Sequence, residues 1–363
     1  MTKESSIYLD LIRFLAAFIV MLSHFSFQRF TGDSITFLHP FGQIGVIIFF
    51  VMSGYVISFV AHTKENDIKS YFISRFSRLY SVVLPVLFLI PIFDFIGQNN
   101  SLVMYENYFR NDLYIIRMLS NLVFLQQIWF YGIGYLSNGP LWSLGYEFWY
   151  YVLFGLSLFI SGYKKYFFIF FVALIIGPKI LLLLPVWLFG VWIYNFHKNK
   201  ELNQTISRIL FFLSPFLFLY CFSFYNEINE YVYSILGNDI KLKLGFSAGF
   251  LTDYITAFFI GIHILSMKYI NLNILNKALW GGEKMIRFFA NSSFSLYLFH
   301  FPLLLFFGAI LNHNPNSKID IFVLFSLTFV SCILLAQFTE KKKYVYKKYI
   351  TFIWEKVEKR IQK

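Results

Sequence analysis

Long apolar runs alternate with short polar segments along the whole chain. A helix of about 20 apolar residues matches the hydrocarbon thickness of a bilayer, whereas the strands of a membrane barrel would give shorter, alternating segments. The pattern therefore predicts an all-α, polytopic integral membrane bundle of about ten transmembrane helices. The expected spans are roughly 7–28, 43–62, 80–97, 113–130, 143–161, 166–196, 208–226, 245–267, 286–308 and 319–338.

The run 166–196 is ambiguous, because it is long enough for two short segments that meet at Pro178. Counting it as one crossing places most basic loops and the basic C-terminus on one side, as the positive-inside tendency requires. We therefore expect ten crossings with both termini cytoplasmic. One conflict remains, because Lys164 and Lys165 would then lie on the outside.

Composition supports a membrane protein and locates the charge. The chain is 58% hydrophobic and only 14% charged, which excludes an ordinary soluble domain. Its net charge is +12, and the stretch from Thr339 to Lys363 holds nine Lys/Arg and three Glu, so half of the excess lies there. We expect a transmembrane domain over 1–340 and a cytoplasmic tail over 341–363 beside anionic lipid, and no nucleic-acid partner.

The first span carries three ionisable residues in an otherwise apolar run, Asp10, Arg13 and His24, and the last two are eleven residues apart. Eleven helical residues turn three times plus about 20°, so the two side chains share a face, about 16 Å apart along the axis. A snorkelling arginine and a carbonyl-bonded histidine would explain either residue alone. The pair favours a polar path inside the bundle, because charged groups in lipid are costly unless they are paired or hydrated.

Arg75 and Arg78 are three residues apart at the start of the third span. Residues at this spacing are neighbours on a helix, and two guanidinium forks side by side suit phosphate groups. Ordinary positive-inside charge is the alternative explanation.

A third motif, GPLWSLGYEFWYY, places Glu147 one turn inside an aromatic helix. Ser143 lies one turn before it and Tyr151 one turn after it, so all three share a stripe. An unpaired carboxylate would be costly there, which favours either a functional role or a structural pair with a distant arginine.

The fourth motif, NSSFSLYLFHFP, aligns Ser293, Tyr297 and His300 along one helical face. A lone histidine in such a place is more often a hydrogen-bonded core residue than a catalyst.

Together these motifs resemble the membrane acyltransferase-3 family. The matching residues are Arg13-x10-His24, FFVMSGYVI, Arg75-x-x-Arg78, LWSLGYEFWYY and SFSLYLFHFP, in that order, and the resemblance extends from residue 7 to about 340. Two departures, Phe294 where the family often has Tyr and Tyr150 where it often has Phe, keep an aromatic ring. The chain resembles the stand-alone type, without a fused extracytoplasmic domain.

The resemblance implies a ten-span enzyme that takes an acyl group, usually acetyl from cytoplasmic acetyl-CoA, and places it on a sugar hydroxyl of an exported glycan. His24 would be the catalytic base or transient acyl carrier, with Glu147 orienting it. Arg13, Arg75 and Arg78 would hold the phosphates of acyl-CoA. The remaining candidates, for substrate binding or structure, are Ser143, Tyr151, Ser293, Tyr297 and His300. The acceptor would be a glycan or lipid-linked glycan at the cell (cytoplasmic or inner) membrane, and no metal is expected.

Two other functions fit the intramembrane charges. A transporter of a lipid or small acid would also need Arg, His and Glu along its path, although the paired repeats common in transporters are not evident. A sensor built on an acyltransferase scaffold would share the fold without the chemistry. Release of CoA from acetyl-CoA distinguishes the enzyme from both.

Overall fold

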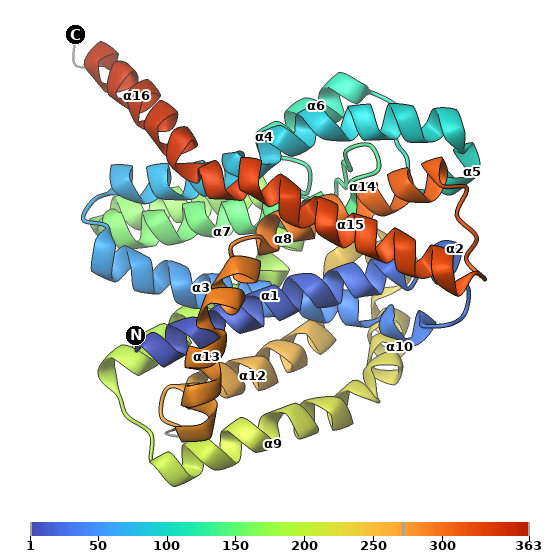
Figure 1. Ribbon diagram of the computed structural model, residues 1–363. Coiled ribbons are helices and arrows are strands. Elements are labelled where there is room, and N and C mark those ends of the chain that lie inside the picture. The colour runs from blue at the N-terminus through green and yellow to red at the C-terminus, as the bar shows by residue number, and fades with distance from the viewer. Residues whose placement is uncertain (1, 271–272, 362–363) are drawn as a thin grey trace.

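The computed structural model describes residues 2–270 and 273–361, and every regular element in these ranges is a helix. The predicted all-α membrane bundle is confirmed. Among the described residues, nine helices run roughly along one another, and seven others lie mainly at the ends and sides of this bundle (Figure 1). The nine are α1 (Lys3–Phe25), α3 (Phe41–Lys64), α4 (Ile68–Asn100), α7 (Trp142–Phe159), α8 (Gly162–Asn199), α9 (Gln204–Phe222), α12 (Phe250–Met267), α14 (Ser293–Ile310) and α15 (Lys318–Phe338). The seven others are α2 (Gln28–Thr31), α5 (Leu102–Tyr105), α6 (Tyr114–Leu122), α10 (Tyr225–Leu236), α11 (Asn238–Leu244), α13 (Asn273–Ala290) and α16 (Lys343–Ile361).

Both termini lie at the same end of the bundle, on the left of Figure 1. Lys69, at the start of α4, forms a 2.7 Å ion pair with Glu358 of α16, and Lys3 forms one of 2.7 Å with Glu283 of α13. We call this end of the bundle the basic end. The opposite end, where α2, α5 and α10 lie, is called the distal end.

Segment 113–130 does not cross the membrane, and the prediction of a span there is wrong. It forms α6, a helix of nine residues, followed by an irregular loop. The loop enters the bundle, where Tyr135 donates a 2.8 Å hydrogen bond to the carbonyl of Leu87, in the middle of α4.

Polar side chains within the apolar run explain this loop. Arg117 donates to the carbonyl of Gly134 at 2.9 Å, and Asn121 donates to that of Ile133 at 3.0 Å. Non-helical backbone is tolerated at membrane depth only where protein groups satisfy it, and these side chains do so.

Helix α8 turns back on itself at Gly177, so that it crosses the bundle twice. It begins after Phe159, whose ring lies 5.6 Å from that of Tyr71 near the basic end. At its middle, the carbonyl of Ile176 accepts a 2.8 Å bond from the backbone of Trp129 in the entering loop. It ends at the basic end, where His197 bonds the carbonyl of Leu265 at 2.8 Å.

Gly177 makes the turn possible. Its φ of 75° lies in the region that favours glycine, and an added Cβ would lie 2.7 Å from the backbone of Trp129. The following residue, Pro178, cannot continue the preceding hydrogen-bond ladder.

Eight segments of the described residues are long and apolar enough to span a membrane. These eight include α8 as one segment and leave out α7. Adding α7 and counting the two halves of α8 separately gives ten segments that connect the two ends, the number expected from the sequence. The total is unchanged because residues 113–130 form no crossing and the reversal at Gly177 adds one. Lys164 and Lys165 consequently lie at the basic end with the other basic loops, which removes the conflict in the sequence-based topology.

This topology predicts the outcome of reporter fusions. A reporter inserted beside Lys164 should report the same side as one fused at Lys363, and one inserted at Gly237 should report the opposite side. Opposite results for Lys164 and Lys363 would mean that α8 crosses only once.

The helix pair α3–α8 is packed closely enough to fix the residues beside it. An added Cβ on Gly54 of α3 would lie 2.0 Å from the carbonyl oxygen of Trp187 in α8. Small residues allow this backbone approach in membrane bundles. The contact holds the neighbouring Ser53 in place in the interior.

Candidate active site

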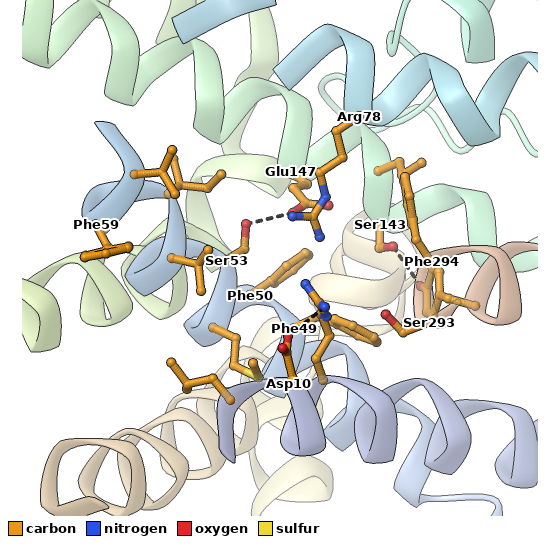
Figure 2. A pocket seen from close by; sticks show the side chains of 18 of the residues that line it. Asp10, Phe49, Phe50, Ser53, Phe59, Arg78, Ser143, Glu147, Ser293 and Phe294 are labelled. Carbon is orange, nitrogen blue, oxygen red and sulfur yellow. Dashed lines mark hydrogen bonds and ion pairs between the residues drawn. The ribbon is translucent and has the colours of Figure 1, made fainter. Parts of the chain in front are cut away.

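A cavity of about 220 Å³ extends from the basic end into the bundle between α1, α3, α4, α7 and α14 (Figure 2). We call it the basic-end cavity. Its wall combines apolar side chains with a few polar groups, the usual composition of a small-molecule site. The charged residues that line it are Asp10, Arg13, Lys64, Arg78 and Glu147, and the hydroxyl-bearing ones are Ser6, Ser53, Ser143, Ser293 and Tyr297.

Arg13 belongs to a chain of ion pairs along one wall. It donates to Asp10 at 2.8 Å, and Asp10 also accepts from Arg287 of α13 at 2.8 Å. Arg287 continues to Glu283 at 3.0 Å. Hydrogen bonds from Lys3 and Arg287 hold the pKa of Glu283 below its ordinary value, so that this surface carboxylate stays charged. The chain fixes the position of Arg13 at the cavity wall.

Arg78 differs from Arg13 in that its guanidinium takes part in none of the ion pairs or side-chain hydrogen bonds found among the described residues. It points from α4 into the cavity, between Glu147 and Asp10, and interacts electrostatically with both (Figure 2). A guanidinium with unused donors inside a cavity is suited to bind an anionic ligand bidentately.

Arg75 does not join Arg78, although the two are neighbours in sequence. Its two terminal nitrogens each donate to a carboxylate oxygen of Glu65 at 2.8 Å, and its side chain is 4% exposed. It also lies over the ring of Tyr71, at 4.6 Å from the centroid. The structure therefore does not form the double-arginine clamp that the spacing suggested, because Glu65 already occupies one of the two forks.

Glu147 is held by hydroxyl groups. Its Oε1 accepts a hydrogen bond of 2.7 Å from Ser53 and another from Tyr151, and Ser53 and Tyr151 lie 3.2 Å apart. Of the predicted stripe on α7, Tyr151 thus contacts Glu147 directly. Ser143 instead pairs with the hydroxyl of Tyr297 on α14 at 2.7 Å, and Ser293 lines the same cavity.

A second cavity, of about 460 Å³, lies toward the distal end, and His24 lines it. We call it the distal cavity. Trp142 lines this cavity whereas its chain neighbour Ser143 lines the basic-end cavity. The Ser143–Tyr297 pair, with the residues beside it, therefore lies in the partition between the two cavities.

His24 contacts His300, and the contact determines its tautomer. Nδ1 of His300 lies 2.9 Å from the carbonyl of Leu296 and must donate to it, so the Nε2 atom of His300 is an acceptor. That atom lies 2.9 Å from Nδ1 of His24, which is 3.1 Å from the carbonyl of Val20. Nδ1 of His24 therefore carries the hydrogen. Its Nε2 keeps an unshared electron pair and makes no hydrogen bond with the described residues.

The structure does not bring Glu147 to His24, because the carboxylate is turned to Ser53 and Tyr151 in the other cavity. His300, expected to be an acceptor-side or structural residue, is the group that orients His24. Arg13 and His24 share a helical face as predicted, yet they line different cavities.

Several polar residues of the two cavities were not among the site residues predicted from the sequence. Two of them, Ser53 and Lys64, line the basic-end cavity. In the sequence, Asp10 is a charged residue in an apolar helix, and this is the signal that could have identified it as a site residue. Lys179 directly follows Pro178, at which the two parts of the 166–196 run meet, and it lies in the wall of the distal cavity.

Comparisons with known proteins give a consistent result. The model of a family described as an acyltransferase domain matches residues 6–337. Proteins of Staphylococcus aureus strains COL and MSSA476, provisionally named as O-acetyltransferases, are each 23% identical over 366 residues, which is 92% of this chain and 56% of theirs. The chain thus spans little more than half the length of these relatives. A protein of Shigella phage Sf6 named O-acetyl transferase is 27% identical over 61% of this chain and 71% of its own. No solved structure was found to match.

Proposed function

The chain belongs to the acyltransferase domain family, and from this membership we propose that it is an integral membrane O-acyltransferase. Its donor would be cytoplasmic acetyl-CoA, and its acceptor a hydroxyl of a cell-surface or exported polysaccharide, as the free glycan or linked to a lipid. The observation that carries the proposal is the pair of cavities. One contains an arginine that forms no ion pair with the described residues, and the other an imidazole nitrogen that forms no hydrogen bond with them.

The basic-end cavity fits the donor. Arg78 has free guanidinium donors, and Arg13 and Lys64 add positive charge, so the three suit the phosphates of acetyl-CoA. At about 220 Å³ the cavity is below the range of about 300–1,000 Å³ typical of drug-sized ligands. It would therefore take the acyl end of the donor and the arm next to it, leaving the nucleotide at the mouth beside Lys64.

The distal cavity fits the acceptor. Nε2 of His24 would accept the proton of an acceptor hydroxyl as its oxygen attacks the thioester carbonyl, forming the new C–O bond. The C–S bond then breaks, and the proton is returned to the leaving thiolate of CoA. Alternatively, Nε2 attacks the thioester carbonyl first, and the C–S bond breaks with release of the CoA thiolate. The acceptor hydroxyl then takes the acyl group from Nε2, and its proton passes to the thiolate. In both routes the hydrogen bond with His300 keeps the hydrogen of His24 on Nδ1, so that Nε2 is unprotonated when the reaction begins.

The charge of the loops suggests how the protein sits in the cell membrane. Lysines of the α3–α4 turn, the α7–α8 turn and α16 gather at the basic end. The positive-inside tendency makes this the cytoplasmic end. The donor cavity would then open toward the compartment that contains acetyl-CoA, and the distal cavity toward the exported glycan.

The proposal predicts that membranes containing this protein release free CoA from acetyl-CoA and place base-labile acetyl esters on surface glycans. CoA release by a thiol assay and glycan-bound ester by mass spectrometry should both fall to background when the gene is deleted. A transporter would alter neither quantity in this way, so unchanged CoA release together with unchanged ester would refute the enzyme.

A further inference from the structure

The wall of the distal cavity is strongly cationic. Arg110, Lys179 and Lys243 line it, and none of the described residues that line it is an aspartate or a glutamate. The basic-end cavity, by contrast, sets two carboxylates against its three cations. An unbalanced positive lining attracts anions, and low-dielectric walls concentrate that field.

Lys179 is the unusual member of this lining, because it is buried and has no counter-ion in the part of the chain that the structure describes. Its side chain is only 2% exposed, yet the one partner of its ammonium group within the described chain is the carbonyl of Tyr131. It takes part in none of the ion pairs among the described residues. An ammonium group has three donors, and a buried charge without an opposite charge is costly.

The fold holds Lys179 in this position firmly. The turn at Gly177 directs the start of the second half of α8 to the cavity, and the carbonyl of Lys179 accepts a 2.9 Å bond from Ser247. The backbone of Lys179 is therefore fixed at the cavity wall, where a ligand in the cavity would supply the anion that the described residues do not provide.

Other groups of the same wall suit a hydroxyl-rich molecule. Asn138 is 1% exposed, and its amide donates to the carbonyl of Leu298 at 2.9 Å, whereas its Oδ1 has no partner among the described residues. The rings of Trp142 and Phe246 stack at 4.1 Å and line the cavity. Amide oxygens accept from hydroxyls, and flat aromatic surfaces pack against apolar faces of ring-shaped ligands.

We propose that the acceptor carries an anionic group, a carboxylate, sulfate or phosphate, which binds Lys179 while a hydroxyl of the same molecule reaches His24. This inference rests on the proposed function, because it takes the distal cavity as the acceptor side. The anion has two possible sources, an acidic sugar of the glycan or the phosphate of a lipid carrier. Arg110 and Lys243 then supply the long-range attraction, and Lys179 the specific contact.

Binding to the purified full-length protein in lipid nanodiscs tests the proposal without turnover. The probes are two matched pairs: methyl glucuronoside with methyl glucoside, and a short polyprenyl phosphate with the corresponding polyprenol. Binding is followed by thermal shift and by tryptophan fluorescence. We expect at least one anion to bind about tenfold to a hundredfold more tightly than its neutral partner, the range for a hydrogen bond to a charged group. Lys179→Met should remove this preference.

The controls separate the site from general charge and from misfolding. Lys164→Met removes one exposed lysine at the basic end and should leave the anion preference unchanged. The wild-type comparison of each charged probe with its neutral partner needs no variant, so it stays informative even if Lys179→Met does not fold.

Each outcome decides the proposal. A preference for the glucuronoside alone supports it with an acidic sugar as the source, and one for the polyprenyl phosphate alone supports it with a lipid carrier. Equal binding of charged and neutral partners overturns it, as does a preference that persists in Lys179→Met. Because no donor is present, these results are independent of CoA release, so the proposed function can fail while this site is upheld, and the reverse.

Discussion

Replacing His24 by alanine is expected to lower acyl transfer by about 10²–10⁴-fold, the usual contribution of a general base. Acetyl-CoA should still bind with unchanged affinity, because His24 lines the distal cavity and the arginines line the other one. The measurement is kcat for CoA release beside the Kd for acetyl-CoA in membranes with equal amounts of protein. A wild-type kcat in this variant would show that His24 is only a packed polar residue and not the base.

His300 should behave as a positioning residue for His24. His300→Ala is expected to lower kcat strongly. The double variant with His24→Ala and His300→Ala should have a kcat little lower than that of His24→Ala alone, because the effects of substituting residues that act as a unit are not additive. His300→Gln should restore part of the loss, since its amide oxygen can accept the same hydrogen bond from Nδ1 of His24. His62→Ala, a change at an exposed histidine of α3 outside both cavities, is the matched control.

The second large effect is expected at Arg78. Arg78→Ala should weaken acetyl-CoA binding by about tenfold to a hundredfold, because it removes a charge-assisted contact to phosphate. Arg78→Lys should recover only part of the affinity, since an ammonium group lacks the bidentate fork. Isothermal titration with acetyl-CoA measures both effects, and an unchanged Kd in Arg78→Ala would return this residue to ordinary positive-inside charge.

Arg75 is the informative comparison for Arg78, because it is three residues away yet bound to Glu65. Arg75→Ala leaves a buried carboxylate unpaired and should cost about 3–5 kcal/mol of stability. The double change Arg75→Met with Glu65→Met should recover most of that stability and retain acetyl-CoA binding. Weaker binding in the stable double variant would give Arg75 a direct part in holding the donor, as the sequence motif suggested.

The sequence predicts the class of fold and the number of crossings, but the crossings of two segments, 113–130 and 166–196, were assigned incorrectly. The two errors cancel in the total number of crossings. Residues 113–130 are apolar enough for a span, and only the hydrogen bonds of Arg117 and Asn121 to a loop further along the chain show why they do not form one. The reversal of α8 depends on the backbone angle of Gly177, which hydropathy does not report. The length of the 166–196 run, its Pro178 and the unexplained Lys164–Lys165 pair were the signs of this error in the sequence.

Within the site, the sequence predicts which residues are polar in the membrane but not which of them meet. Helical spacing correctly placed Glu147 and Tyr151 on one stripe, because both belong to α7. It could not pair His24 with His300, since that contact depends on how α1 packs against α14, 276 residues apart in the chain. Local periodicity describes a face of one helix, and partner choice is a property of the packed bundle.

The partition at Ser143 and Tyr297 has an electrical consequence. Where the cavities on its two sides hold water, the membrane voltage falls mainly across this layer and not over the full thickness of the bilayer. A proton that passes from His24 on one side to a leaving thiolate on the other crosses most of that voltage. Each charge moved in this way is worth up to about 2.3 kcal/mol per 100 mV. Because the negative charge of the attacking oxygen passes to the CoA sulfur in the same direction, no net charge crosses this layer over the complete reaction. An energised membrane would therefore change the rate of the proton step but not the direction in which transfer is favoured.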